Sequence, residues 1–160
     1  MDHPGGGVPA VGRDPRYLAA MVSRTTTYRH QVRYFEADQQ GVVFNMWYLG
    51  YFDEAMSAFL EEGGLAYRDM LAAGFDVQLV HTEIDWQSSL RWQDEAQVEV
   101  ELSRAGTTSF DLHFTVTTGP RLVATGRTVY VVVATDGSGK RPIPDLIRTA
   151  LGPPREDSGV

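Results

Sequence analysis

The chain has 160 residues, of which 42% are hydrophobic and 22% charged, with no cysteine and a formal net charge of −7. These values fit one globular domain and exclude a disordered chain, and the lack of cysteine excludes disulfides, thiolate metal ligands and cysteine nucleophiles. The net negative charge argues against a surface that binds nucleic acid. No apolar run reaches the roughly 20 residues of a membrane-spanning helix. No secretory leader is visible over residues 1–12, so we expect a cytoplasmic protein.

Both ends of the chain are predicted to be tails. Residues 1–23 contain three consecutive glycines and several prolines, and residues 152–160 contain Pro153 and Pro154. Neither segment has a periodic apolar face that could pack on a core. We therefore expect one folded domain over residues 24–151.

The first half of this domain predicts a strand, a turn and a long helix. In residues 28–34, Tyr, His and Val alternate with Arg and Gln, which is the period of a half-buried strand. A turn-like stretch follows at residues 37–41. The helix is expected from about Met46 to Glu62, with Asn45 as its N-cap and Gly63–Gly64 as its stop. Its wide aromatic stripe indicates that it is covered on more than one side.

The second half predicts a short helix near residues 66–73 and then strands joined by tight turns. Those strands are expected at residues 75–87, 97–103, 108–117 and 122–133, with a short terminal helix within residues 142–151. Tight turns make consecutive strands antiparallel neighbours, and helices do not alternate with strands as a parallel sheet requires. The pattern favours an α+β fold, in which a curved antiparallel sheet of about five strands wraps around one long central helix.

One loop carries residues suited to acyl transfer. Asp38 lies between the first strand and the start of the buried helix, where backbone N–H groups lack partners and the helix dipole is positive. Such donors polarise a carbonyl, while a carboxylate attacks the carbonyl carbon or activates water. Gly41 permits a close approach of the backbone to a ligand. On local grounds Asp38 could also be only a turn residue, and Glu36 could be structural or pair with an arginine.

The same loop carries a motif: an acidic residue, a spacer, Asp, two residues, Gly, two apolar residues and an aromatic. Here the motif consists of Glu36, Asp38, Gly41, Val42–Val43 and Phe44. Later segments keep the same order, namely residues 83–86, 91–94, 104–109, 124–127 and 141–144. Over about residues 26–151 the chain resembles the 4-hydroxybenzoyl-CoA thioesterase branch of the hot-dog-fold proteins.

This resemblance implies a hot-dog fold with active sites at a dimer interface. The catalytic aspartate of the family falls on Asp38, and its oxyanion-binding backbone N–H falls on Asn45. We expect the substrate to contact Gly41, Val43, Phe44 and Trp47. Trp47 stands where many members have Asn, which predicts a differently shaped acyl pocket.

The predicted function is hydrolysis of an acyl-CoA thioester, or of an acyl carrier protein thioester, by a homodimer or homotetramer. No cofactor is expected, and no metal, because His30, His81 and His113 lack the spacing of metal ligands. One alternative is a hot-dog dehydratase or hydratase, although the helix and its loop lack the histidine that this chemistry usually uses. Another is a non-catalytic acyl-binding or assembly protein of the same fold.

Overall fold

A computed structural model describes residues 22–155 of the chain. Its elements, in chain order, are β1 Thr25–Gln31, the 3-10 turn η1 Tyr34–Glu36, α2 Trp47–Glu62, α3 Tyr67–Ala72, β2 Phe75–Trp86, β3 Glu95–Ala105, β4 Ser109–Thr118, β5 Arg121–Ala134 and α4 Asp145–Leu151. The predicted tail over residues 1–23 lies almost wholly outside the described residues.

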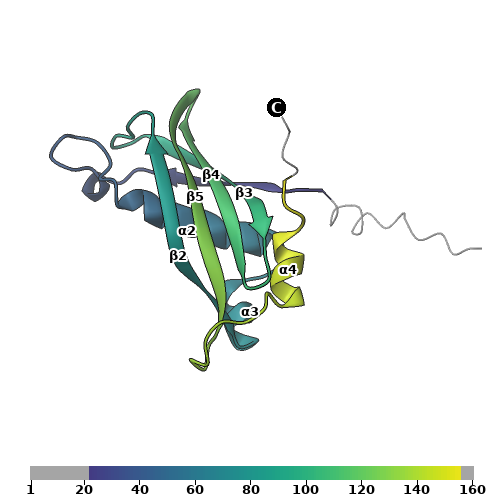
Figure 1. Cartoon of the computed structure of the whole chain (residues 1–160). Coiled ribbons are helices and arrows are strands. Elements are labelled where there is room, and N and C mark those ends of the chain that lie inside the picture. Colours follow the sequence, from purple (N-terminus) through teal and green to yellow (C-terminus); the bar gives the residue numbers. More distant parts are fainter. Residues whose placement is uncertain (1–21, 156–160) are drawn as a thin grey trace, which may run out of the picture.

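The five strands form one antiparallel sheet in the order β1-β3-β4-β5-β2. The sheet curves over α2, which lies behind the strands in Figure 1, and α4 closes one end. Successive strands from β3 onward are neighbours because tight turns join them, whereas β1 and β2 pair across longer connections. The predicted antiparallel sheet around one central helix is confirmed.

The core lies between α2 and the concave face of the sheet. Every second residue of β4 from Phe110 to Val116 is fully buried, as the pleat requires when one face of a strand is covered. From the helix, Phe52 stacks on Phe114 with their ring centroids 4.3 Å apart. The wide aromatic stripe predicted for the helix is therefore the stripe that fills the core.

Two local predictions differ from the structure. The first strand ends at Gln31, and Tyr34 lies in η1 with 76% of its surface exposed. Asn45 is not the N-cap, because α2 begins at Trp47 and the cap position, Met46, already has helical angles and no side-chain cap. Tight backbone hydrogen bonds start the helix instead, for example from the N–H of Trp47 to the carbonyl of Phe44 at 3.0 Å.

The chain stays attached to the sheet after α4. The N–H of Arg155 donates to the carbonyl of Leu102 at 2.9 Å, and its guanidinium pairs with Glu101 at 2.8 Å. Residues 152–155, which the sequence assigns to a tail, thus run along β3. None of the helices in the described part of the chain is long and apolar enough to cross a membrane.

Candidate functional site

Asp38 lies in a short closed loop between η1 and α2. Ala37 and Val43 form an isolated antiparallel bridge, and the N–H of Asp38 donates to the carbonyl of Val42 at 2.8 Å. The N–H of Gly41 donates back to the carbonyl of Asp38 at 2.9 Å, with φ at +75°. A side chain at this φ would be strained, so glycine allows the loop to close within a few residues.

The Asp38 carboxylate uses one oxygen locally and keeps the other free. Its Oδ1 accepts a hydrogen bond from the N–H of Gln40 at 2.7 Å, which is the geometry of an Asx turn. Its Oδ2 has no hydrogen-bond or ion-pair partner among residues 22–155. The half-buried side chain borders a cavity of about 560 Å³, lined also by Tyr34, Phe35, Ala37, Gln39, Gly41, Arg91 and Trp92. Asp38 can therefore stabilise its turn through Oδ1 and still react through Oδ2.

The start of α2 supplies backbone donors without acceptors. The N–H groups of Trp47, Tyr48 and Leu49 are bonded to carbonyls three residues earlier. In the described chain, the N–H groups of Asn45 and Met46 donate to no other group. Both stand at the positive end of the dipole of a 16-residue helix, so this position attracts a developing negative charge.

The other predicted substrate contacts divide between two cavities and the core. Gly41 borders the Asp38 cavity, whereas Trp47 borders a separate cavity of about 240 Å³ next to Gly50 and Tyr51. Phe44 is 44% exposed at the helix start. Val43 is 5% exposed and belongs to the core, and its N–H donates to the carbonyl of Leu90 at 2.9 Å. Its side chain supports the loop and borders neither cavity.

The sequence did not predict a buried polar cluster that lies beside the loop. Glu36 is 3% exposed and lies against His30, whose Nε2 is 2.8 Å from Oε2 of Glu36. The hydroxyl of Tyr51 donates to the same oxygen at 3.0 Å, and so does the N–H of Arg33 at 2.8 Å. Glu36 thus pairs with a histidine and a tyrosine, not with an arginine side chain. The only sequence signal was the placement of His30 on the inward face of the first strand.

The protonation state of Glu36 follows from this surrounding. Burial raises the pKa of the Glu36 carboxyl, but hydrogen bonds from Arg33, His30 and Tyr51 outweigh the burial, so that the pKa lies below its usual range. Burial and the adjacent carboxylate raise the pKa of Tyr51, which remains a neutral donor. Glu36 is therefore held as a carboxylate by hydrogen bonds within the core.

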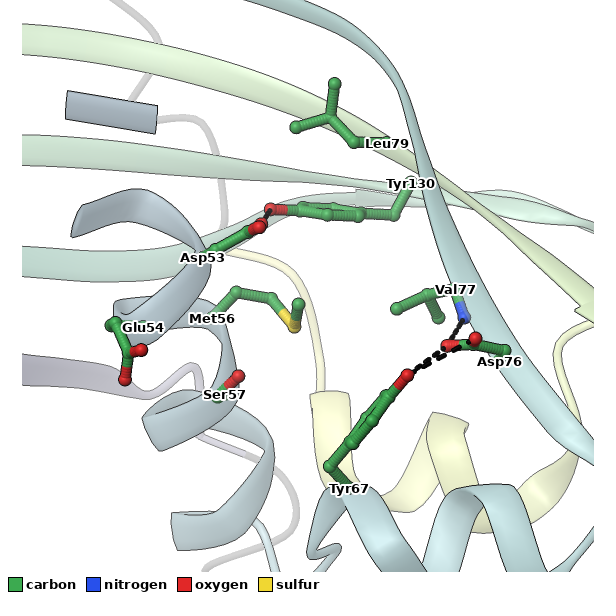
Figure 2. Close-up of a pocket in the computed structure, with 9 residues that line it drawn as sticks. All are labelled: Asp53, Glu54, Met56, Ser57, Tyr67, Asp76, Val77, Leu79 and Tyr130. Atoms are coloured by element: carbon green, nitrogen blue, oxygen red, sulfur yellow. Dashed lines mark hydrogen bonds between the residues drawn. The ribbon is translucent and has the colours of Figure 1, made fainter. Parts of the chain in front are cut away.

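A third cavity, of about 350 Å³, opens between α2 and β2 (Figure 2). Two tyrosine–aspartate pairs border it: Tyr130 donates to Asp53 at 3.1 Å, and Tyr67 donates to Asp76 at 3.2 Å. Burial raises the pKa of Tyr130, so that its hydroxyl remains a donor. Nowhere in residues 22–155 do three His, Asp or Glu side chains converge as metal ligands would.

Comparisons with known proteins agree with this architecture. The family model described as the Thioesterase-like superfamily matches residues 32–151. A 1,4-dihydroxy-2-naphthoyl-CoA hydrolase of Nostoc punctiforme is 26% identical over 133 residues, which cover 82% of this chain and 90% of that protein. The structure of a 1,4-dihydroxy-2-naphthoyl-CoA thioesterase from Synechocystis has 27% identity and a TM-score of 0.73, covering 80% of this chain and 96% of that chain. A protein of Aquifex aeolicus has 27% identity and a TM-score of 0.75, covering 79% and 98%.

Proposed function

The chain belongs to the Thioesterase-like superfamily, and from this premise we propose that it hydrolyses acyl-CoA thioesters with Asp38 as the reacting carboxylate. The chain is a thioester hydrolase with the hot-dog fold. Its place in the 4-hydroxybenzoyl-CoA thioesterase branch remains a prediction. The observation that carries the proposal is a carboxylate with one oxygen that no group of residues 22–155 engages, placed ahead of a helix start. There, seven and eight residues on, the N–H groups of Asn45 and Met46 have no acceptor in that same part of the chain.

In the proposed reaction, the thioester carbonyl oxygen accepts hydrogen bonds from the N–H groups of Asn45 and Met46. These donors stabilise the negative charge that develops on that oxygen. Asp38 either adds to the carbonyl carbon, releasing the CoA thiolate and leaving a mixed anhydride that water hydrolyses, or removes a proton from the attacking water. In both routes the thiolate leaves with the sulfur electrons and is protonated to the free thiol.

We further propose that the acyl group is aromatic. Phe35 and Trp47 meet edge to face, with centroids 5.5 Å apart, between the cavity beside Asp38 and the cavity beside Glu36. Aromatic walls of this kind suit a planar acyl group. The relatives from Nostoc punctiforme and Synechocystis are both named for a dihydroxynaphthoyl thioester, which supports the same class.

The deciding experiment is a panel of acyl-CoA thioesters assayed by release of free thiol. The protein has no cysteine, so a thiol reagent reports only the CoA that is released. We expect turnover of hydroxylated benzoyl- and naphthoyl-CoA to exceed that of aliphatic acyl-CoA of similar size. Thioesters of an acyl carrier protein belong in the same panel. Tight binding without thiol release would instead support an acyl-binding protein.

Substitution of Asp38→Asn tests the residue assignment. It keeps the size of the side chain but removes the charge, so kcat should fall about 10²-fold or more while KM changes much less. The matched control is Asp136→Asn, because Oδ1 of Asp136 also accepts the N–H two residues on, at 2.8 Å, in an exposed hairpin. That control should leave kcat unchanged. A near-normal kcat in Asp38→Asn would refute the assignment.

A further inference from the structure

We infer that Glu36 is a positioning residue, which holds the loop carrying Asp38 at a fixed place against α2. The inference rests on the proposed function, because it assigns Glu36 a role through Asp38. Glu36 itself lies in the buried cluster and does not border the Asp38 cavity.

The side chain of Glu36 ties three parts of the fold together. Three donors converge on its Oε2: the N–H of Arg33 at the start of η1, the hydroxyl of Tyr51 in α2, and Nε2 of His30 in β1. The ring of His30 also packs on the ring of Tyr51, with centroids 4.7 Å apart. A buried carboxylate is stable only when its hydrogen bonds are satisfied, so these donors define where Glu36 can sit.

The backbone of Glu36 reaches the other side of the proposed site. Its carbonyl accepts the N–H of Phe44 at 2.9 Å, and Phe44 directly precedes Asn45, one of the two proposed oxyanion donors. Asp38 follows Glu36 by two residues. Glu36 thus connects both Asp38 and the start of α2, where the proposed oxyanion donors lie, to the buried cluster.

Few other polar contacts hold the loop against the helix within residues 22–155. In η1 and the loop, Tyr34, Phe35 and Phe44 are 76%, 60% and 44% exposed. Among residues 22–155, the Asp38 side chain bonds only to the N–H of Gln40. The other contacts in the described residues are the buried side chain of Val43, its backbone bond to Leu90, and the edge-to-face packing of Phe35 on Trp47. If the donors at Oε2 are lost, Asp38 should therefore move relative to α2, whose own position is fixed by the core.

Glu36→Gln is the direct test. Glutamine keeps the shape but has no charge, so the three donors are held more weakly. Its amide NH2 would also replace Oε1, which lies 3.0 Å from Nε2 of His30. We expect kcat to fall about 10-fold or more with KM changed little, because displacement of a reacting group by about 1 Å can cost up to 10²-fold. The same substitution in an Asp38→Asn background should have no further effect on the residual rate, because the position of the loop then no longer matters.

The outcomes separate the inference from the proposed function. A fall in kcat for Asp38→Asn but none for Glu36→Gln, or equal effects of Glu36→Gln in both backgrounds, would overturn the inference alone. Unchanged kcat in Asp38→Asn would overturn both. If Glu36→Gln does not fold, Tyr51→Phe removes one donor and keeps the ring, and it should show the same background dependence with a smaller loss.

Asp111→Asn is the matched control for a buried carboxylate. Asp111 is 1% exposed and pairs with Arg104 and Arg127 within the sheet, outside all three cavities. This substitution should lower the melting temperature but leave kcat unchanged. A loss of kcat matching that of Glu36→Gln would assign both effects to general destabilisation and overturn the inference.

Discussion

Trp47 lies at the junction between the loop and the helix. Its side chain is half-buried at the margin of the core, meets Phe35 edge to face and borders the 240 Å³ cavity. Because the indole packs only on the edge of the core, Trp47→Ala should fold and should shift kcat/KM toward bulkier acyl groups by about 10-fold or more. The measurement is kcat/KM over a series of acyl-CoA thioesters. Unchanged selectivity would place Trp47 in the core or in a subunit contact.

The buried carboxyl of Asp111 should make the stability of the fold depend on pH. Burial raises the pKa of its carboxyl, but hydrogen bonds and charges from Arg104 and Arg127 outweigh the burial, so the pKa is lowered overall. A carboxyl with a lowered pKa in the folded state stabilises the fold above its unfolded pKa of about 3.9, and this contribution is lost as the pH falls through the folded value. The urea midpoint of the wild type should therefore fall on acidification below about pH 4.

The comparison variant for this effect is again Asp111→Asn. It should be less stable than the wild type at pH 7, and the difference should shrink as the pH falls below about 4, because the Asp111 carboxyl of the unfolded wild-type chain then becomes protonated. A difference that stays constant from pH 7 to pH 3 would show that the carboxylate charge contributes nothing to the pH dependence.

At the scale of elements, the contact between α2 and β5 decides how closely the helix lies on the sheet. A Cβ added at Gly126 would stand 2.5 Å from Cε2 of Phe52 and 3.1 Å from the carbonyl of Glu83. Phe52 cannot move aside, because it is fully buried against Phe114. Gly126→Ala should therefore destabilise the fold by about 1–3 kcal/mol, as overpacked cores do, measured by urea unfolding.

Gly50→Ala is the control for this substitution. Gly50 lies inside α2, and a Cβ there meets nothing within 4 Å. Alanine should raise the free energy of unfolding by about 0.5–1 kcal/mol, because glycine is a poor residue for a helix interior. Equal effects of the two substitutions would mean that α2 is not held close to β5.

At the scale of the whole molecule, β2 is an edge strand with an exposed apolar surface. Leu79, Val80 and Trp86 are 43%, 57% and 48% exposed along a strand of 12 residues. Such an edge has unpaired backbone groups that pair readily with another chain. We therefore predict a homodimer or homotetramer, visible as an even-numbered assembly by light scattering.

Val80→Lys should weaken this assembly, because a lysine on an edge strand opposes pairing. If the active site is shared between subunits, thiol release should fall as the assembly dissociates on dilution. A wild-type chain that is monomeric at micromolar concentration and still turns over would contradict a shared site.

Regular elements were predictable because their patterns are local. The period of two in β3 and β4, the helical stripe of α2 and the glycines at the turns depend only on near neighbours in the chain. The motif from Glu36 to Phe44 was identified differently, by its resemblance to a known family. The start of α2 was predicted to within one residue, but Asn45 was wrongly assigned as its N-cap. A capping side chain and a tight backbone turn satisfy the same N–H groups, and the sequence does not distinguish them.

By itself, the sequence determined the order of the elements, one antiparallel sheet around a helix, and a loop with Asp38 ahead of a helix start. The tertiary structure alone decided which distant residues meet. His30 and Tyr51 reach Glu36 only because β1 joins the far edge of the sheet beside β3 and α2 packs beneath it. Pairing across long connections depends on burial and register summed over the whole core, and no local pattern of residues encodes that sum.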